Sequence, residues 1–506
     1  MSISRQAIGL MGGPILAVLV FVFCFQSDIS WEASCCAGVA TLCAVWWILE
    51  TLDLAVVGIV PFVAFPVLGV LSASDVAGAY GHSMILLLLG GAFLSAGMEK
   101  CGAHRRLALY LVRAVGGSNG RRLVLGVMLA TAGLSMWISN TATALMMLPI
   151  AMAILSQIED DHALRTALLL GIAYAASIGG MGTPIGTPPN VLMVGYVQET
   201  FGHEVTFFDW MQVTLPIVLV LLPVTWLWIT RKLEGAHSIQ MPDVGVWRQS
   251  EVRVLIIFVV TALAWVFRAA PAGGWSSWIP VTDSDGRSMI NDATIALAAS
   301  LALFIVPAGD KPAEPVRDDS EEAPPRCTER LLDWKATSRV PWGILLMFGG
   351  GLALAQGFET SGLSQIVGTQ LSRIADQPPW LLMLVLCLVV TFLTEITSGT
   401  ATTSLLLPVL GGMSIVSGLP YELILYPAAI SASCAFMLPV ASPPNTIVFA
   451  TGSLSTQQMA RTGLGLNLIA AFLISTVCYF LIPTSDREPA ASEAAVPSES
   501  QAAGVR

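Results

Sequence analysis

The chain has 506 residues, of which 55% are hydrophobic and 11% are charged, and its formal net charge is −10. Soluble globular proteins carry about 25% charged residues, so this composition excludes a soluble enzyme and predicts a membrane protein with about ten crossings. Lysine and arginine form no long basic block, which excludes nucleic acid as a partner, and the nine cysteines form no CxxC pair that would indicate a disulfide or metal framework.

Apolar stretches long enough for membrane helices follow one another along the whole chain. In order they are 7–25, 34–52, 55–71, 83–98, 123–157, 166–198, 211–230, 252–268, 293–307, 342–358, 379–414, 421–452 and 463–483. The stretches 123–157 and 379–414 are too long for one helix and carry a polar cluster in the middle, which predicts two re-entrant helical hairpins. Glycine and proline interrupt 166–198 and 421–452, which predicts two broken helices.

The distribution of basic residues predicts the orientation. Lysine and arginine cluster in three loops and are absent from three others; the basic loops are 100–122, 231–253 and 311–339, and the others are 26–33, 72–82 and 199–210. The positive-inside rule places the basic loops in the cytoplasm. We therefore expect about eleven transmembrane helices plus the two hairpins, with a cytoplasmic N-terminus and an external C-terminus, in the plasma (inner) membrane.

Short motifs recur in the same order in the two halves of the chain. Gly90-Gly91, Gly97, Glu99 and Gly102 return 260 residues later, Ser139, Thr141 and Leu148-Pro149 return 259 later, and Pro188-Pro189-Asn190 returns 255 later. The loop 100–122 holds six basic residues, whereas its counterpart 360–379 holds only Arg373. Equivalent loops are thus expected on opposite sides, which indicates inverted-topology repeats. Such repeats with broken helices are typical of secondary transporters, whose breaks mark the binding site.

The interrupted segments are rich in groups that bind small ions. The first hairpin tip is Ser135–Thr143, the first break is Gly179–Asn190, and their partners are Thr394–Thr400 and Leu438–Asn445. Unwound carbonyls and hydroxyls are oxygen ligands suited to an alkali cation, and amides at helix N-termini suit an anion.

Charged side chains are nearly absent from these segments. Neither 123–157 nor 166–198 contains one, 379–414 contains only Glu395, and 421–452 contains only Glu422. An anionic substrate would then depend on helix dipoles and co-bound cations, which indicates cation-coupled transport. Glu395 is either functional or a brace of its hairpin, and both interpretations stay open.

Other classes of protein lack their signatures in this sequence. There is no GK[ST] phosphate loop for ATP-driven transport, and no HExxH motif of a metal-dependent hydrolase. We therefore expect a protein that is not an enzyme and has no catalytic residues. An ion antiporter with the same breaks but no organic substrate is the alternative from a different class.

Several motifs together resemble those of the divalent anion/sodium symporter family. They are Trp46-Trp47 with Glu50, the Ser139-Asn140-Thr141 tip, the run TEITSGTATT from Thr394 to Thr403, both Pro-Pro-Asn breaks, and Leu332-Asp333-Trp334-Lys335 before Pro341-Trp342-Gly343. The resemblance covers about residues 30–483. It implies an all-α polytopic homodimer in which a mobile transport domain moves against a scaffold, as an elevator, and carries dicarboxylates, citrate or sulfate.

The resemblance also implies a division of the chain. The expected parts are scaffold helices at 1–122, the first half of the transport domain at 123–233, scaffold helices at 234–378, the second half of the transport domain at 379–483, and a disordered tail at 484–506. Within the second scaffold part, the acidic segment 308–330 is expected to be a flexible cytoplasmic linker.

The same resemblance assigns two sodium sites and one substrate site. The first sodium site would comprise Ser135, Ser139, Asn140 and Gly186, and the second Thr394, Thr397, Gly399 and Ala441. The substrate site would comprise Asn140, Thr141, Thr187, Pro188, Ser398, Thr400, Ser442 and Pro443. Na⁺ would be a coupling ion, not a prosthetic group.

One position departs from the family pattern. The family has Ser-Asn-Thr at both tips, whereas this chain has Gly399 in place of the second Asn. The missing carboxamide either makes room for a bulkier dianion or alters the second sodium site. We expect sodium-coupled symport of a divalent organic anion, a C4-dicarboxylate such as succinate, malate or fumarate. A sulfate, tricarboxylate or citrate carrier, or an anion exchanger, remains the alternative within the family.

Overall fold

The computed structural model describes most of the chain as helices joined by short loops. The described residues are 5–116, 119–156, 161–233, 245–269, 273–279, 281–282, 288–310, 330–375 and 377–482. Within these ranges there are isolated β-bridges but no strands. The all-α prediction is therefore confirmed. The predicted tail 484–506 and nearly all of the predicted linker 308–330 lie outside the described residues.

The first half of the chain forms α1 to α12. Their bounds are α1 Arg5–Gln26, α2 Trp31–Ile48, α3 Leu54–Val57, α4 Val60–Leu68, α5 Ala73–Tyr80, α6 Ser83–Cys101, α7 Ala103–Gly116, α8 Gly120–Ser135, α9 Asn140–Leu155, α10 His162–Gly180, α11 Pro188–Phe201 and α12 Phe207–Thr230. Capping residues set several of these limits: Ser30 caps α2, and α6 ends at Gly102, whose φ of 78° favours glycine.

From α15 onward, the second half of the chain follows the same order of elements as α6 to α12 in the first. Its helices are α13 Gln249–Val266, η1 Trp275–Trp278, α14 Asp292–Ile305, η2 Trp334–Arg339, α15 Trp342–Thr360, α16 Leu363–Ala375, α17 Pro379–Thr394, α18 Gly399–Ser417, α19 Glu422–Ser431, α20 Pro443–Phe449 and α21 Thr456–Leu481.

Both predicted hairpins and both predicted broken helices are present. The stretch 123–157 folds as α8, a short tip and α9, and 379–414 folds as α17, a tip and α18. The stretch 166–198 folds as α10, a break and α11, and 421–452 folds as α19, a break and α20. The polar cluster or the Gly/Pro run thus interrupts each helix where the sequence predicted.

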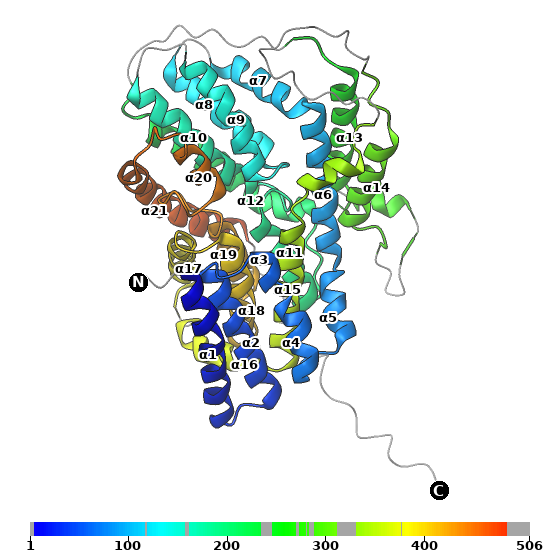
Figure 1. The fold of residues 1–506 in the computed structure, drawn as a ribbon, viewed down its shortest axis with the longest axis vertical. Helices are drawn as coiled ribbons and strands as arrows, with labels where there is room; N and C mark the ends of the chain where they lie inside the picture. The colour runs from blue at the N-terminus through cyan, green and yellow to red at the C-terminus, as the bar shows by residue number, and fades with distance from the viewer. Residues whose placement is uncertain are drawn as a thin grey trace.

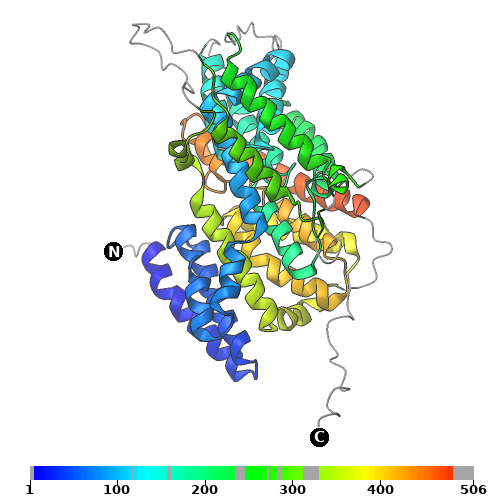
Figure 2. The ribbon, with the colours of Figure 1, turned by 90° about the vertical axis from the view of Figure 1, so that its right-hand side faces the viewer.

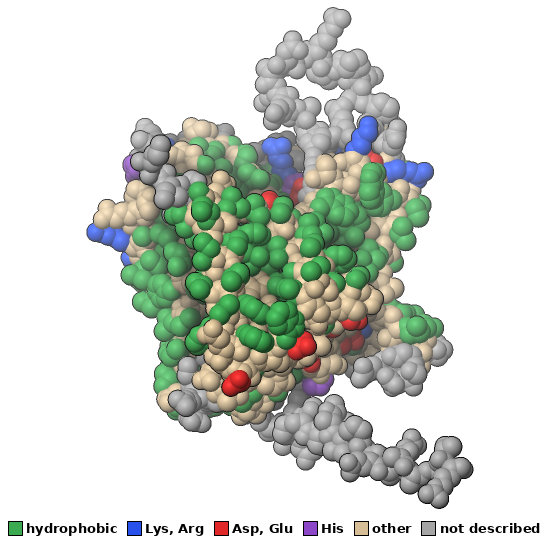
Figure 3. Space-filling model, turned by 60° about the horizontal axis from the view of Figure 1, so that its bottom comes forward, with side chains coloured by type: hydrophobic (Ala, Val, Ile, Leu, Met, Phe, Trp, Pro, Cys, Tyr) green, Lys and Arg blue, Asp and Glu red, His purple; other side chains and the backbone are tan. Residues whose placement is uncertain are grey.

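Eight described helices are long and apolar enough to span a membrane. They are Gln6–Gln26, Trp31–Ile48, Ala73–Cys101, His162–Gly180, Phe207–Thr230, Gln249–Val266, Gly399–Ser417 and Thr456–Leu481. Large hydrophobic side chains such as Val67 (80% exposed) and Phe480 (77%) face outward. The surface in Figure 3 is accordingly broad and apolar, with few charged side chains on the side shown. The chain is an integral membrane protein, while its number of crossings stays a prediction.

Equivalent glycines in the two halves allow helices to approach closely. A Cβ on Gly90 of α6 would lie 2.5 Å from Cβ of Ala296 in α14, and a Cβ on Gly350 of α15 would lie 2.3 Å from the carbonyl oxygen of Gly58. Small residues at such crossings let membrane helices pack backbone against backbone. The repeated Gly-Gly motif therefore has the same packing role in α6 and α15.

Elements of the two halves interlock around the centre of the molecule. Helix α20 of the second half contacts α9 and α10 of the first, and α11 of the first half contacts α18 of the second. Figures 1 and 2 show α1 to α5 at one end of the molecule, beside α16 and α18, and α7 to α10 at the other end. Segments of the hairpins and broken helices of the two halves are therefore in contact with one another.

A buried ion-pair network joins the loop after α11 to the helices α13 and α14. The Arg268 guanidinium lies 2.6 Å from Oδ1 of Asp292 and 2.6 Å from Oε1 of Glu204, and Arg268 is 3% exposed. The backbone N–H of Phe207 donates to Oδ2 of Asp292 at 3.2 Å. Ring stacking continues the contact, because Phe207 lies 4.7 Å from Trp265 and 6.0 Å from Trp137 at the first tip, measured between ring centroids.

Candidate ion and substrate site

An asparagine holds the first break in its unwound shape. Nδ2 of Asn190 donates to the carbonyl oxygens of Gly180 at 2.9 Å and Thr183 at 2.8 Å. Its Oδ1 is buried and has no hydrogen-bond partner among the described residues. Carbonyls released by the interruption of α10 thus find donors in the protein, as backbone at membrane depth requires.

The second break repeats this arrangement atom for atom. Nδ2 of Asn445 donates to the carbonyl oxygens of Ala435 at 2.9 Å and Leu438 at 3.0 Å, and its buried Oδ1 also lacks a described partner. In both halves the acceptors lie ten and seven residues before the asparagine. The Pro-Pro-Asn motif therefore has one structural role in both breaks.

The residues just before the two Pro-Pro-Asn motifs adopt the same conformation. Thr187 has φ −144° and ψ 145°, and Ser442 has φ −146° and ψ 150°. Neither side chain caps its helix, and Oγ of Ser442 is buried without a described partner. These hydroxyls are free to bind a ligand at the start of α11 and α20.

Oxygen atoms crowd together at the first hairpin tip. Oγ of Ser135 lies 2.7 Å from Oδ1 of Asn140 and 2.7 Å from the carbonyl oxygen of Ala176. A single hydroxyl proton cannot serve both acceptors fully, so oxygen lone pairs of this cluster stay available. Ser139, also predicted as a sodium ligand, caps α9 by accepting from the N–H of Ala142 at 3.3 Å.

The first tip is in direct contact with the first break. A Cβ on Gly180 would lie 2.4 Å from Oδ1 of Asn140, and a Cβ on Gly186 would lie 2.4 Å from the carbonyl oxygen of Gly180. The structure therefore brings together three of the four residues predicted for the first sodium site, Ser135, Asn140 and Gly186, and the fourth, Ser139, immediately precedes Asn140.

Threonine hydroxyls take the equivalent place at the second tip. Oγ1 of Thr394 donates to the carbonyl oxygen of Ala432 at 3.1 Å. Oγ1 of Thr397 lies 2.5 Å from Oγ1 of Thr402 and donates to the carbonyl oxygen of Leu393 at 2.9 Å. The four residues predicted for the second sodium site come from the same tip and break, although two of the hydroxyls already have protein partners.

Gly399 is enclosed, not adjacent to open space. A Cβ on Gly399 would lie 2.3 Å from the carbonyl oxygen of Ala432, which is a backbone atom. Its repeat mate Asn140 packs against Gly180, and the repeat mate of Gly180 is Ala435. The first half thus has an asparagine at the tip and a glycine at the break, whereas the second half has a glycine at the tip and an alanine at the break. In the direction of its absent Cβ, Gly399 creates no room for a larger anion.

Glu395 is a brace of the second break. Its carboxylate accepts from the N–H groups of Met437 at 2.8 Å and Leu438 at 2.9 Å, and from Nδ2 of Asn467 at 2.7 Å. Oδ1 of Asn467 in turn accepts from the N–H of Phe436 at 3.3 Å. The buried charge is satisfied by three donors, which accounts for the only carboxylate in its hairpin. Sequence reasoning missed Asn467, whose one signal is that it is the single Asn of α21.

The last helix of the first half braces its break in a similar way. Nε1 of Trp210 in α12 donates to the carbonyl oxygen of Met181 at 2.9 Å, and Oγ1 of Thr214 donates to that of Gly182 at 3.3 Å. The helices α12 and α21 therefore each hold the break of their own half.

The chain is similar over most of its length to one known family and to named transporters. Residues 10–482 match the family described as "Sodium:sulfate symporter transmembrane region". The chain belongs to this family. Two relatives named "Sodium-dependent dicarboxylate transporter SdcS" are similar along most of their length: that of Staphylococcus aureus is 38% identical (94% of this chain, 91% of the relative), and that of Staphylococcus saprophyticus is 36% identical (94% and 92%).

Solved structures share the fold at low sequence identity. The YdaH transporter of Alcanivorax borkumensis superposes with a TM-score of 0.53 at 14% identity, over 80% of this chain and 87% of that chain. MtrF of Neisseria gonorrhoeae gives 0.55 at 15% identity, over 81% and 83%. The family expected from the motifs is thus confirmed, and the fold is one found in transporters.

Proposed function

We propose that this protein is a secondary transporter that couples sodium entry to the import of a C4-dicarboxylate. The observation that carries the proposal is that four helices begin at the tips and breaks and pack in pairs across the two halves: α9 and α18 begin at the tips, α11 and α20 begin at the breaks, and α9 contacts α20 as α11 contacts α18. Their N-termini favour negative charge. Relatives named for sodium-dependent dicarboxylate transport support this choice of substrate class.

Coupling follows from the charges at this site. The tips and breaks contain no lysine or arginine, and their one carboxylate, Glu395, is bound by three donors at the second break. A dianion would therefore meet helix N-termini and neutral groups. Sodium ions bound to the oxygen clusters would offset the desolvation of two carboxylates. Ser135, Ser139, Asn140 and Gly186 would hold one ion, and Thr394, Thr397, Gly399 and Ala441 a second. Substrate affinity then depends on sodium, and neither solute crosses alone.

The substrate would lie between the tips and the Pro-Pro-Asn breaks. Its carboxylates would meet Asn140, Thr141, Thr187 and Pro188 from the first half, and Ser398, Thr400, Ser442 and Pro443 from the second. The unpartnered Oγ of Ser442 and the uncapped start of α11 support this placement.

The movement proposed for transport is that of an elevator. Both hairpins and both broken helices interlock through α9 with α20 and through α11 with α18, which supports their moving as one body. The expected homodimer, the cytoplasmic N-terminus and the plasma-membrane location belong to the same proposal.

A binding screen tests the substrate class. The purified protein is heated with mono-, di- and tricarboxylates and with sulfate, each in sodium, potassium or choline salts. We expect succinate, malate or fumarate to raise the melting temperature in sodium and to have little effect in choline. If only sulfate or citrate raised the melting temperature, that anion would replace the dicarboxylate as the proposed substrate. Equal stabilisation in all three cations would contradict sodium coupling.

A further inference from the structure

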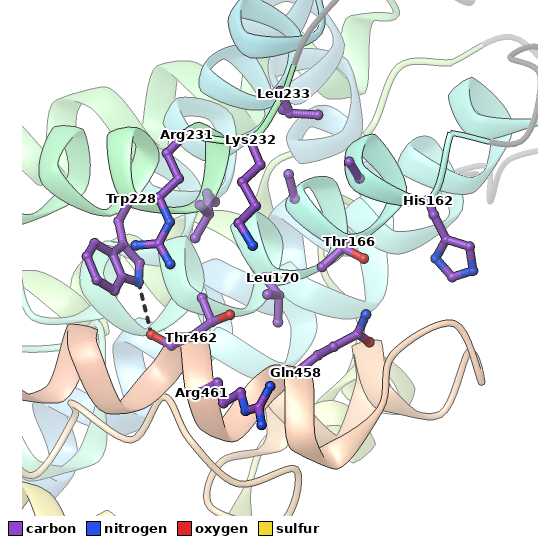
Figure 4. Close-up of a pocket in the computed structure, with 13 residues that line it drawn as sticks. His162, Thr166, Leu170, Trp228, Arg231, Lys232, Leu233, Gln458, Arg461 and Thr462 are labelled. Atoms are coloured by element: carbon purple, nitrogen blue, oxygen red, sulfur yellow. Dashed lines mark hydrogen bonds between the residues drawn. The ribbon is translucent and has the colours of Figure 1, made fainter.

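A cavity of about 500 Å³ lies where one end of α10, α12 and α21 meet. None of the residues predicted for sodium or substrate lines it. Figure 4 shows Lys232 extending from the end of α12 toward α21, on which Arg461 and Gln458 lie. The cavity thus joins helices of both halves of the chain at a distance from the tips and breaks.

Three positive charges converge on this cavity. Arg231, Lys232 and Arg461 all line it, all three are exposed, and among the described residues no carboxylate lies within ion-pair distance of any of them. Cations commonly follow the C-terminus of a helix, which accounts for the two residues after α12. Arg461 lies near the N-terminal end of α21, where the helix dipole does not favour a cation. Because Arg461 lines the cavity together with Arg231 and Lys232, its position suits it to bind an anion.

A fixed tryptophan orients one of these charges. Nε1 of Trp228 donates to the carbonyl oxygen of Thr462 at 3.1 Å, and the guanidinium carbon of Arg231 lies 3.8 Å from the centroid of the Trp228 ring. A Cβ on Gly465 would lie 2.4 Å from that ring, so the indole is wedged between α12 and α21. This packing holds the Arg231 side chain in place before any ligand arrives.

Part of the cavity lining is apolar. Ala167 and Leu170 of α10, together with Ile229, line it among the basic and polar side chains. Leu227 (58% exposed) and Leu464 (42%) stand on the outer surface of α12 and α21 beside it. Basic and apolar side chains in one cavity, next to an apolar outer surface, match a ligand with a phosphate group and a hydrocarbon part.

We propose that this cavity binds the phosphate of an acidic phospholipid head group, such as that of phosphatidylglycerol. Basic pockets between transmembrane helices on the cytoplasmic side are suited to such head groups. A free phosphate or phosphate monoester shares the charge chemistry but does not use the apolar lining. A lipid bound here would tie α10 and α12 to α21 and stabilise the contact between the two halves.

Delipidated full-length protein in neutral detergent tests the site. Phosphatidylglycerol, phosphatidylcholine with the same acyl chains, and glycerol phosphate are titrated while the melting temperature and lipid adducts by native mass spectrometry are recorded. We expect phosphatidylglycerol to raise the melting temperature and to form a one-to-one adduct, and the other two to do neither. Equal protection by glycerol phosphate would overturn the lipid as the source of the phosphate.

Variants locate the binding. The triple change Arg231→Gln, Lys232→Gln and Arg461→Gln should weaken phosphatidylglycerol binding by roughly tenfold or more. The matched control is Arg105→Gln, Arg113→Gln and Arg122→Gln, which removes the same charge from exposed positions outside the cavity and should bind normally.

A single substitution keeps the test valid if the triple variant misfolds. If the triple variant does not fold, Arg461→Gln alone, at an exposed position, should still lower the affinity severalfold. Unchanged binding by a folded pocket variant, or an equal loss in the control, would overturn the site.

Discussion

Asn140 is the residue on which the first ion site depends most. Its Oδ1 accepts a hydrogen bond from the Ser135 hydroxyl and packs against Gly180, so it contacts both the tip and the break. In Asn140→Ala we expect sodium-dependent uptake to fall by more than tenfold while expression and the melting temperature change little. Asn291→Ser, which keeps the cap of α14, is the control and should transport normally. Wild-type uptake by Asn140→Ala in proteoliposomes would refute the assigned site.

Gly399 offers a second test at the scale of one residue. A Cβ there meets the backbone of Ala432, so Gly399→Asn should destabilise the protein by about 1–3 kcal/mol, as overpacking does. Gly418→Asn is the control, because that glycine has φ 70° and open space around it, a conformation that Asn tolerates.

The clash at Gly399 has its source in the backbone. Adding Ala435→Gly to Gly399→Asn recreates the residue pair of the first half but leaves the Ala432 carbonyl in place, so the double variant should not melt higher than the single one. Thermal unfolding of the three variants measures this. A single variant with unchanged melting temperature would mean that the tip and the break are not packed as described.

Among the elements, the second break depends on one carboxylate. Glu395→Gln keeps the shape but leaves a single oxygen for three donors and directs an NH₂ group at backbone N–H, so we expect a loss of about 1–3 kcal/mol and slower uptake. Glu32→Gln, at an exposed position in the first turn of α2, is the control. Wild-type stability of Glu395→Gln would show that the carboxylate is not the brace.

The hairpins and breaks were predictable because each has a signal in the local sequence. Ser139-Asn140 interrupts an apolar run too long for one helix, and Pro188-Pro189 removes two amide donors from the start of α11. Contacts between distant segments were not predictable. Asn467 reaches Glu395 across 72 residues, and no spacing in the sequence connects them. The enclosure of Gly399 likewise depends on the approach of Ala432, which the motif does not reveal.

For the molecule as a whole, the Arg268 network links the predicted transport domain to the predicted scaffold. Arg268→Gln leaves Asp292 buried without its cation, so we expect a loss of about 3–5 kcal/mol. Adding Asp292→Asn removes the unpaired charge and should recover part of that loss. Thermal denaturation of the two variants measures both effects. If both variants melted at the temperature of the wild type, the network would not stabilise the protein.

Sodium coupling is the central claim, and a gradient measurement tests it most directly. Purified protein is reconstituted into liposomes, labelled succinate is present at equal concentration on both sides, and a sodium gradient is the only driving force. We predict that succinate accumulates against its own gradient, that dissipating the sodium gradient abolishes the accumulation, and that choline does not replace sodium. Accumulation that is independent of the sodium gradient, or exchange of succinate without any sodium requirement, would contradict the account.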